Sequence, residues 1–333
     1  MKRIVYNIII LCFCASCEQN NQVCNLDDVA VEECVLETHK IDSVLLSPQS
    51  INVWHDKIIV MEGQKKVGMI SFFSTKDFSY QFSGVEKGHA RNEVSMLNIG
   101  YYAKTDSSFF VLSGNEEKEY VLSGNSLIYV ASTPITIPDA LNQVLHLDED
   151  RYITSGFSNG KGGEHILYVN GEFQEFGEYP GENLEDGGNF FFNGSFSAGM
   201  FGKKNIWDFY FGHNLIRSYD HFGNLMEEIH LIDDKRCKIS DVNDHDLFYV
   251  GLKWNATYLA ALYNNGHSWN NFYTCDKNEI RNELQLWSWD GVLKRRVCFD
   301  KPFDIYALSD DNKFYAMDVD NPNVIYSYDF EKK

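Results

Sequence analysis

The residues best suited to catalysis by type and spacing are a serine and its flanking glycines. Gly156-Phe157-Ser158-Asn159-Gly160 matches the G-x-S-x-G pattern, in which a nucleophilic serine sits on a sharp turn between a strand and a helix. A strand-like run, 152–154, precedes the pattern. Three residues, Lys161-Gly162-Gly163, and a second strand-like run follow where the helix should begin. The sequence therefore predicts a glycine-rich turn here, and we assign no catalytic residue.

Metal-ligating patterns are equally sparse. The ten histidines are scattered singly, without the H-x-x-x-H pair that binds zinc on one helix face. Two segments, 241–246 and 318–321, are rich in Asp and Asn, but neither has the glycine and distal glutamate of a calcium-binding EF-hand loop. Acidic residues are common in turns between strands. We predict no metal site and no cofactor.

Aromatic residues crowd one long insert in the second half of the chain. Trp254 and Trp269 are its largest members, and several tyrosines and asparagines lie between them. Exposed Trp and Tyr rings suit sugar stacking or a protein-binding hot spot. The alternative is that these rings fill spaces inside the fold, since aromatic residues are abundant throughout the chain. Both interpretations stay open at this point.

The first residues have the layout of a secretory signal. Lys2 and Arg3 are followed by a mostly apolar run from Ile4 to Phe13, about half the roughly 20 residues that a spanning helix needs. The next four residues, Cys14-Ala15-Ser16-Cys17, resemble a bacterial lipobox, although the position usually held by leucine is Cys14. This resemblance implies cleavage before Cys17 and a lipid on its thiol. Cleavage by the general signal peptidase, with a free Cys17, is the alternative.

We therefore expect three segments: a lipoprotein signal peptide at 1–16, a lipidated cysteine and polar tether at 17–34, and one folded domain at 35–333. The partner expected at the N-terminus is a membrane, and the expected location is the cell envelope at the outer membrane. An acidic run directly after the lipidated cysteine resembles a surface-export signal. Only Glu18 is acidic before Asp27, so exposure to the periplasm and exposure on the cell surface both stay open. Cys24 and Cys34 could pair across the tether, because an exported protein meets oxidising conditions.

Composition excludes one class of partner. The chain carries 48 acidic against 29 basic residues, a formal net charge of −19. An acidic surface repels phosphate backbones, so we predict no nucleic-acid binding. Aromatic residues make up 15% of the chain, more than a disordered protein carries, so a packed core is expected.

The remaining pattern is a repeat of short strands and polar turns. Nearly every apolar stretch past Val35 alternates with period two or is a short β-branched and aromatic run, which predicts an all-β fold. Hairpin turns such as Asn170-Gly171 and Asp290-Gly291 recur about every 50 residues, a period typical of propeller blades. Six units predict a six-bladed β-propeller of four-stranded antiparallel blades. The spare strand 35–41 would close the ring by joining the last blade, and two sandwiches are the competing architecture.

The combination of lipobox, tether and six degenerate four-stranded repeats resembles the TolB-like six-bladed propeller lipoproteins of Bacteroidota. Many of them carry a Gly-x-Gly-Pro-Gly-Glu-like segment after the first blade. The matching segment here runs from Gly84 to Glu93 and lacks the Gly-Pro-Gly core. We expect a functional loop there, with His89, Arg91 and Glu93 as candidate binding residues. The resemblance implies a propeller and a lipoprotein, but no reaction.

Two functions follow as hypotheses. The first is a membrane-anchored binding or scaffolding module that recognises an envelope protein, peptide or glycan, with His89, Arg91, Glu93, Trp254 and Trp269 as candidate contacts. The second is a propeller hydrolase or lyase with its site at the central channel. We favour the non-enzymatic module because no catalytic motif is present. Two titratable groups beside a substrate-sized pocket at the channel mouth would favour the enzyme.

Overall fold

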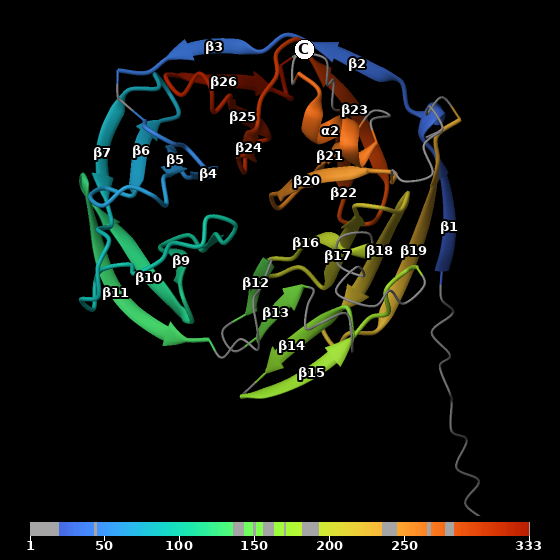
Figure 1. The fold of residues 1–333 in the computed structure, drawn as a ribbon, viewed down its shortest axis with the longest axis horizontal. Helices are drawn as coiled ribbons and strands as arrows, with labels where there is room; N and C mark the ends of the chain where they lie inside the picture. Colours follow the sequence, from blue (N-terminus) through green and yellow to red (C-terminus); the bar gives the residue numbers. More distant parts are fainter. Residues whose placement is uncertain are drawn as a thin grey trace, which may run out of the picture.

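The fold is seen in a computed structural model that describes residues 20–42, 45–135, 143–148, 151–155, 163–169, 171–181, 193–234, 245–264, 268–276 and 283–332. Within these residues, six mostly antiparallel sheets are arranged radially around a common centre (Figure 1). This is the predicted six-bladed β-propeller. The signal segment and Cys17 lie outside the described residues.

The first three blades each contain four consecutive strands. Blade 1 comprises β4 (Ser50–Trp54), β5 (Lys57–Met61), β6 (Ile70–Ser74) and β7 (Tyr80–Gly84). Blade 2 comprises β8 (Ala103–Lys104), β9 (Phe109–Ser113), β10 (Glu116–Ser123) and β11 (Ser126–Pro134). Blade 3 comprises β12 (Gln143–Asp148), β13 (Arg151–Ser155), β14 (His165–Val169) and β15 (Glu172–Phe176).

The last three blades recruit strands from the N-terminal segment. Blade 4 comprises β16 (Ser195–Ala198), β17 (Asn205–Tyr210), β18 (Leu215–Asp220) and β19 (Leu225–Ile232), with β1 (Asn20–Asn25) at its edge. Blade 5 comprises β20 (Tyr249–Trp254), β21 (Tyr258–Tyr263), β22 (Glu283–Ser288) and β23 (Leu293–Phe299), with β2 (Val31–Cys34) at its edge. Blade 6 comprises β24 (Ile305–Leu308), β25 (Lys313–Met317), β26 (Val324–Asp329) and β3 (Glu37–Lys40).

Local sequence explains the hairpins. The predicted turn His55-Asp56 joins β4 and β5, and Trp54 pairs with Lys57 across it. His55 has a positive φ of 52°, which a turn of this kind requires. Two-residue turns with a glycine also join β9 to β10 and β10 to β11, where Gly114 and Gly124 have φ of 58° and 59°.

The ring closes through the predicted spare strand. The outer strand of blade 6 is β3, which pairs antiparallel with β26, so that Glu37 lies opposite Ser327 and Lys40 opposite Val324. Closure of this kind satisfies the outer edge of β26. It also ties the N-terminal part of the chain to the last blade (Figure 1).

The structure differs from the expected tether over residues 20–34. Here β1 pairs in parallel with β19, and β2 pairs in parallel with β23. A short 3₁₀ helix, η1 (Leu26–Asp28), connects the two strands, and Leu26 is fully buried. The sequence of residues 20–34 is polar because an outer strand of a sheet exposes one face to water. Such a strand needs few large apolar residues to pack against its sheet.

Cys24 and Cys34 do not form a disulfide. The first lies on β1 of blade 4 and the second on β2 of blade 5, and both are free thiols. The Cys34 thiol donates a hydrogen bond to the Tyr328 hydroxyl at 3.1 Å. The two strands extend along different blades, and this separates the cysteines.

The core lies between neighbouring blades. The described buried apolar residues form six clusters, and each cluster joins two adjacent blades. Between blades 4 and 5, for example, Phe209 meets Trp287 and Tyr249 edge-on, with ring centroids 6.3 and 5.0 Å apart. Blades splay outward from the centre, and large rings fill the widening gaps. This explains the high aromatic content.

Besides η1, the described residues contain a second short helix that was not predicted. It is α2 (Trp269–Thr274), in the insert between β21 and β22, and the Ser268 hydroxyl accepts a hydrogen bond from the Asn271 backbone N–H as its N-cap. No helix in the described part of the chain is both long and apolar enough to cross a membrane.

Candidate functional site

The structure brings three predicted binding residues together. His89, Arg91 and Glu93 line one pocket of about 570 Å³, between the loop that follows β7 and the β9–β10 turn. Lys118 and Tyr129 of blade 2 complete its wall. The lining is mostly polar, and the volume is in the range of small-molecule sites. We call this the lateral pocket.

Glu93 shapes the loop that carries the other two residues. Its carboxylate accepts a hydrogen bond from the Ala90 backbone N–H at 2.9 Å. Gly88 passes so close that a Cβ there would lie 1.9 Å from the Glu93 carboxylate. A side chain at position 88 would displace the Glu93 carboxylate, so the glycine there and the Glu93 hydrogen bond together close the loop.

The cationic side of the lateral pocket is built around Tyr129. The guanidinium of Arg91 and the ammonium of Lys118 each lie 5.7 Å from the centre of the Tyr129 ring. Lys118 also donates to the Arg91 backbone carbonyl at 2.9 Å and lies 3.3 Å from the Glu116 carboxylate. The hydrogen bond with the Ser132 hydroxyl has the largest effect on the pKa of Tyr129, and Arg91 has a smaller one. Together they hold that pKa below its usual range. His89 and Arg91 are exposed to solvent at the pocket.

The two predicted tryptophans do not join this pocket. Trp254 lines the central channel and packs against the clusters on both sides of blade 4. Trp269 begins α2 and lines neither the lateral pocket nor the channel. The predicted Gly156–Gly160 turn lies outside the described residues.

The central channel holds a smaller cavity of about 110 Å³. All six blades contribute to it, mainly through their innermost strands β4, β8, β12, β20 and β24 and the turn after β16. The titratable side chains of its described lining are Tyr102, Lys104, His146 and Lys253, and this lining contains no carboxylate. We call this the central cavity.

Lys253 stands out in the central cavity. No hydrogen-bond acceptor or acidic partner for it is found among the described residues, and burial lowers the pKa of its ammonium to about 8. Lys104, by contrast, is paired: its ammonium lies 2.8 Å from an Asp310 carboxylate oxygen and donates to the Val53 carbonyl at 3.2 Å. His146 Nδ1 lies 3.0 Å from the Glu117 carboxylate.

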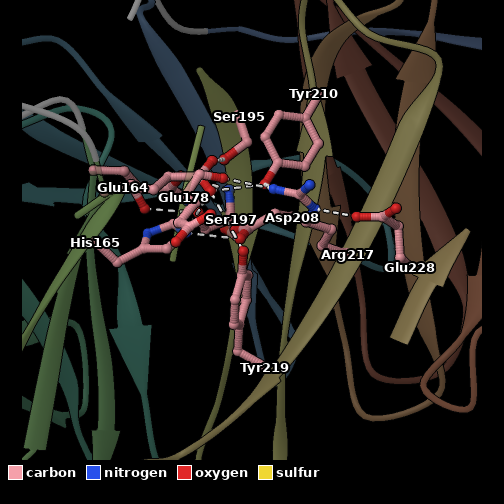
Figure 2. A network of polar contacts seen from close by, with 12 residues as sticks. Glu164, His165, Glu178, Ser195, Ser197, Asp208, Tyr210, Arg217, Tyr219 and Glu228 are labelled. Atoms are coloured by element: carbon pink, nitrogen blue, oxygen red, sulfur yellow. Dashed lines mark hydrogen bonds and ion pairs between the residues drawn. The ribbon is translucent and has the colours of Figure 1, made fainter. Parts of the chain in front are cut away.

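A third polar group lies buried between blades 3 and 4 (Figure 2). His165 Nε2 and Asp208 Oδ2 are 2.7 Å apart, and both side chains are fully buried. Glu164 lies beside them and accepts hydrogen bonds from the hydroxyls of Tyr210 and Tyr219 at 2.8 and 3.4 Å. We call Glu164, His165, Asp208, Tyr210 and Tyr219 the buried network.

Burial and charge set the protonation of the buried network. Desolvation raises the pKa of Glu164 to about 7. Burial alone would lower the pKa of His165, but the Asp208 carboxylate outweighs it and raises that pKa. At neutral pH, Glu164 is therefore protonated in a substantial fraction of molecules, beside the hydrogen-bonded His165 and Asp208 side chains.

Three ligand atoms of Glu164, His165 and Asp208 lie within 4.8 Å of one another, so the set could in principle hold a metal ion. Their side chains are at most 2% exposed, which leaves no path for a substrate. Hydroxyl donors already occupy Glu164, and Arg217 donates to the Tyr210 hydroxyl from the far side (Figure 2). The network therefore suits proton sharing inside the fold.

Sequence reasoning missed Lys253 and the buried network. Lys253 sits in an alternating strand, where a lysine ordinarily points to solvent, and only closure of the ring turns it toward the centre. His165 and Asp208 are 43 residues apart on different blades, and no local motif connects them. Both sites are products of tertiary structure.

Comparisons with known proteins show the fold alone. No family model and no curated protein matches the chain. A member of the DUF4221 family from Bacteroides vulgatus is 9% identical, with 90% of this chain and 96% of that chain aligned and a TM-score of 0.57. A presumed exported protein from Bacteroides fragilis is 10% identical over 90% of this chain and 87% of that chain, with a TM-score of 0.47. A luciferin-regenerating enzyme is 11% identical over 89% and 96%, with a TM-score of 0.49.

Proposed function

We propose that this chain is an exported lipoprotein of the cell envelope whose propeller binds a carboxylate-bearing peptide or glycan of that compartment in the lateral pocket. The observation that carries the proposal is the meeting of His89 and Arg91 on one polar pocket of about 570 Å³. The ring itself is a rigid frame, and binding residues are commonly held on loops of such frames.

Charge favours an acidic group in the lateral pocket. The carboxylate of Glu93 is occupied by the loop backbone, and that of Glu116 faces Lys118. The guanidinium of Arg91 offers a planar set of donors that suits a carboxylate. The lining holds two basic side chains and two carboxylates in a chain of net charge −19, so Arg91 selects acidic ligands only at short range, through direct contact.

The order of segments supports the anchor. A positive start, an apolar run and the small residues before Cys17 form a signal of the lipoprotein type. Only Glu18 and Gln19 separate Cys17 from the first strand, β1. A lipid on Cys17 would therefore hold the rim of blade 4 close to the membrane, without a long tether.

The anchor is tested by fractionating cells that express the full chain. We expect wild type in the membrane fraction and Cys17→Ala in the soluble envelope fraction. Cys24→Ala, which removes a cysteine within β1, should fractionate like wild type. Equal release of wild type and Cys17→Ala to the soluble fraction would contradict lipid attachment.

Binding is tested by calorimetry with short glutamate-rich peptides, oligouronates and a neutral glucan as the three probes. Loss of a charge-assisted hydrogen bond costs about 1.5–3 kcal/mol, so Arg91→Ala should weaken binding of the acidic probe roughly ten- to hundredfold. Lys76→Ala removes an exposed lysine from the β6–β7 turn and is the matched control. Binding of the neutral glucan alone, or equal affinity of wild type and Arg91→Ala, would overturn the assignment.

The alternative, a hydrolase or lyase at the central channel, is less well supported. Lys253 and His146 do line the central cavity, but its volume of about 110 Å³ is smaller than the 300–1,000 Å³ of typical ligand sites. A sugar ring with its leaving group needs more room. The described lining also lacks the pair of carboxylates that glycoside hydrolysis commonly uses.

A further inference from the structure

We propose that the central cavity is a second binding site, for a small organic carboxylate, and that Lys253 supplies the positive charge that holds it. This site is separate from the lateral pocket and does not depend on the function proposed for that pocket. The geometry that points to it is a half-buried, unpaired lysine on a small, partly open cavity at the centre of the ring, whose described lining contains no carboxylate.

Lys253 needs a negative partner. Its side chain is half-buried, and an ammonium withdrawn from water without a partner is destabilising, so folded proteins normally pair such a group or neutralise it. No described residue accepts a hydrogen bond from Lys253 or forms an ion pair with it. With a pKa of about 8, the amine is still mostly protonated at neutral pH. A bound anion would supply the partner that the protein does not.

The composition of the cavity lining singles out this position. The chain has 48 acidic residues, yet the described lining contains none. The other lysine of the lining, Lys104, is already held by Asp310 at 2.8 Å. Lys253 is therefore the uncommitted cation of the described lining.

His146 lines the cavity but is not placed to bind the ligand directly. Its Nδ1 lies 3.0 Å from the Glu117 carboxylate, and its ring is fixed between Tyr152 and Phe201, with centroids 4.4 and 4.7 Å away. Both ring nitrogens are buried, so neither can reach an anion in the cavity without a movement of the ring.

Size and surface select the kind of anion. A volume of about 110 Å³ fits an organic acid of a few carbon atoms and excludes a nucleotide or a sugar acid chain. Apolar side chains of Met200, Phe201, Trp254 and Leu308 form part of the wall beside Lys253. An ion with one charged end and a short apolar body matches both surfaces, whereas a fully hydrated inorganic ion matches only the lysine.

The test is a calorimetric titration of the full chain with acetate, pyruvate, inorganic phosphate and chloride as separate probes. We expect acetate or pyruvate to bind, and Lys253→Met to reduce its affinity at least tenfold. Lys253→Arg keeps the charge and should retain most of the binding. Lys204→Met, an exposed lysine beyond the cavity lining, and Arg91→Ala, in the lateral pocket, should bind like wild type.

The outcomes separate clearly. Equal affinity of wild type and Lys253→Met, or failure of both carboxylates to bind wild type, would overturn the proposal. Binding of phosphate or chloride alone would overturn the organic ligand. A thermal unfolding scan shows whether Lys253→Met is folded, and if it is not, the titration is made with Lys253→Gln, which keeps a polar side chain of similar length. Loss of carboxylate binding with unchanged peptide or glycan binding distinguishes this site from the lateral pocket.

Discussion

Glu164 is a carboxylic acid withdrawn almost completely from water. Its side chain is 2% exposed and lies beside the His165–Asp208 pair. Because burial disfavours the charged carboxylate, the folded protein binds a proton at Glu164 more tightly than the unfolded chain does. The folded-state pKa of about 7 lies above the ordinary value of 4.5. Folding stability should therefore fall as the pH rises from about 4.5 to 7.

Glu164→Gln should remove most of this dependence. Glutamine keeps the shape and an acceptor for the Tyr210 hydroxyl but does not titrate. We expect the free energy of unfolding of wild type to fall by up to about 3 kcal/mol more than that of Glu164→Gln between pH 5 and pH 8. Urea unfolding at a series of pH values measures the difference.

The matched control is Glu178→Gln. Glu178 lies near the buried network, but its side chain is exposed. That variant should follow the wild-type pH curve. Parallel curves for wild type and Glu164→Gln would show that Glu164 is ionised in the folded protein at neutral pH.

Sequence patterns identified some of these residues and not others. His89, Arg91 and Glu93 are close in sequence, so a single loop brings them together. Lys253 and Glu164 acquire their properties from blades that are distant in the chain. Residue type and spacing along the chain do not show that a side chain will be buried by a blade distant in sequence.

At the scale of elements, Arg296 fastens the N-terminal segment to blade 5. Its guanidinium forms two hydrogen bonds of 2.8 Å with the Glu283 carboxylate. It also donates to the backbone carbonyls of Leu26 and Val29 at 2.5 and 3.1 Å. Glu283 is 1% exposed, so Arg296 lies beside it in a site closed to water.

Arg296→Leu should destabilise the protein by about 3–5 kcal/mol, because Glu283 would keep a buried charge without its counter-ion. Arg295→Leu is the comparison, since its partner Glu32 is 43% exposed and a surface pair contributes about 1 kcal/mol or less. Denaturant unfolding compares the two, and limited proteolysis reports release of residues 20–34. Similar losses for both variants would show that Arg296 has no special role.

Strand prediction succeeded where turns and alternation coincide. The β4–β5 hairpin has both, and its register follows from the turn at His55. It failed for β1, whose residues are mostly Asn, Gln and Cys. The stability of β1 comes from backbone pairing with β19, which the residue pattern does not record.

At the scale of the whole molecule, the ring depends on a strand from the opposite end of the sequence. His39 of β3 and Ser327 of β26 are 288 residues apart in the chain, and a hydrogen bond of 2.8 Å joins His39 Nε2 to the Ser327 hydroxyl. Without β3, the outer edge of β26 would be unpaired, and exposed edges promote aggregation. Period and blade count were readable from sequence because each blade is a local unit. Closure was readable because one strand was left over.

Graded truncation tests this dependence. A chain starting at residue 20 should unfold cooperatively at a temperature close to that of the full chain. A chain starting at residue 35 loses β1 and β2 but keeps the closing strand, and we expect it to be folded and less stable. A chain starting at residue 42 should aggregate or lose cooperative unfolding. Light scattering and calorimetry distinguish the three, and a stable monomer from residue 42 onward would contradict a need for closure.

The three N-terminal strands run along the rim of three successive blades, from β1 on blade 4 to β3 on blade 6 (Figure 1). They are synthesised before the blades, whereas their partners are made later: β19 ends at residue 232, β23 at 299 and β26 at 329. The closing strand β3 must therefore remain unpaired until almost the whole of this sequence has been synthesised. Long-range contacts of this kind are slow to form. Docking of these strands is thus a late step that reports completion of the ring, and a chain terminated early would leave three unsatisfied strands exposed to envelope proteases.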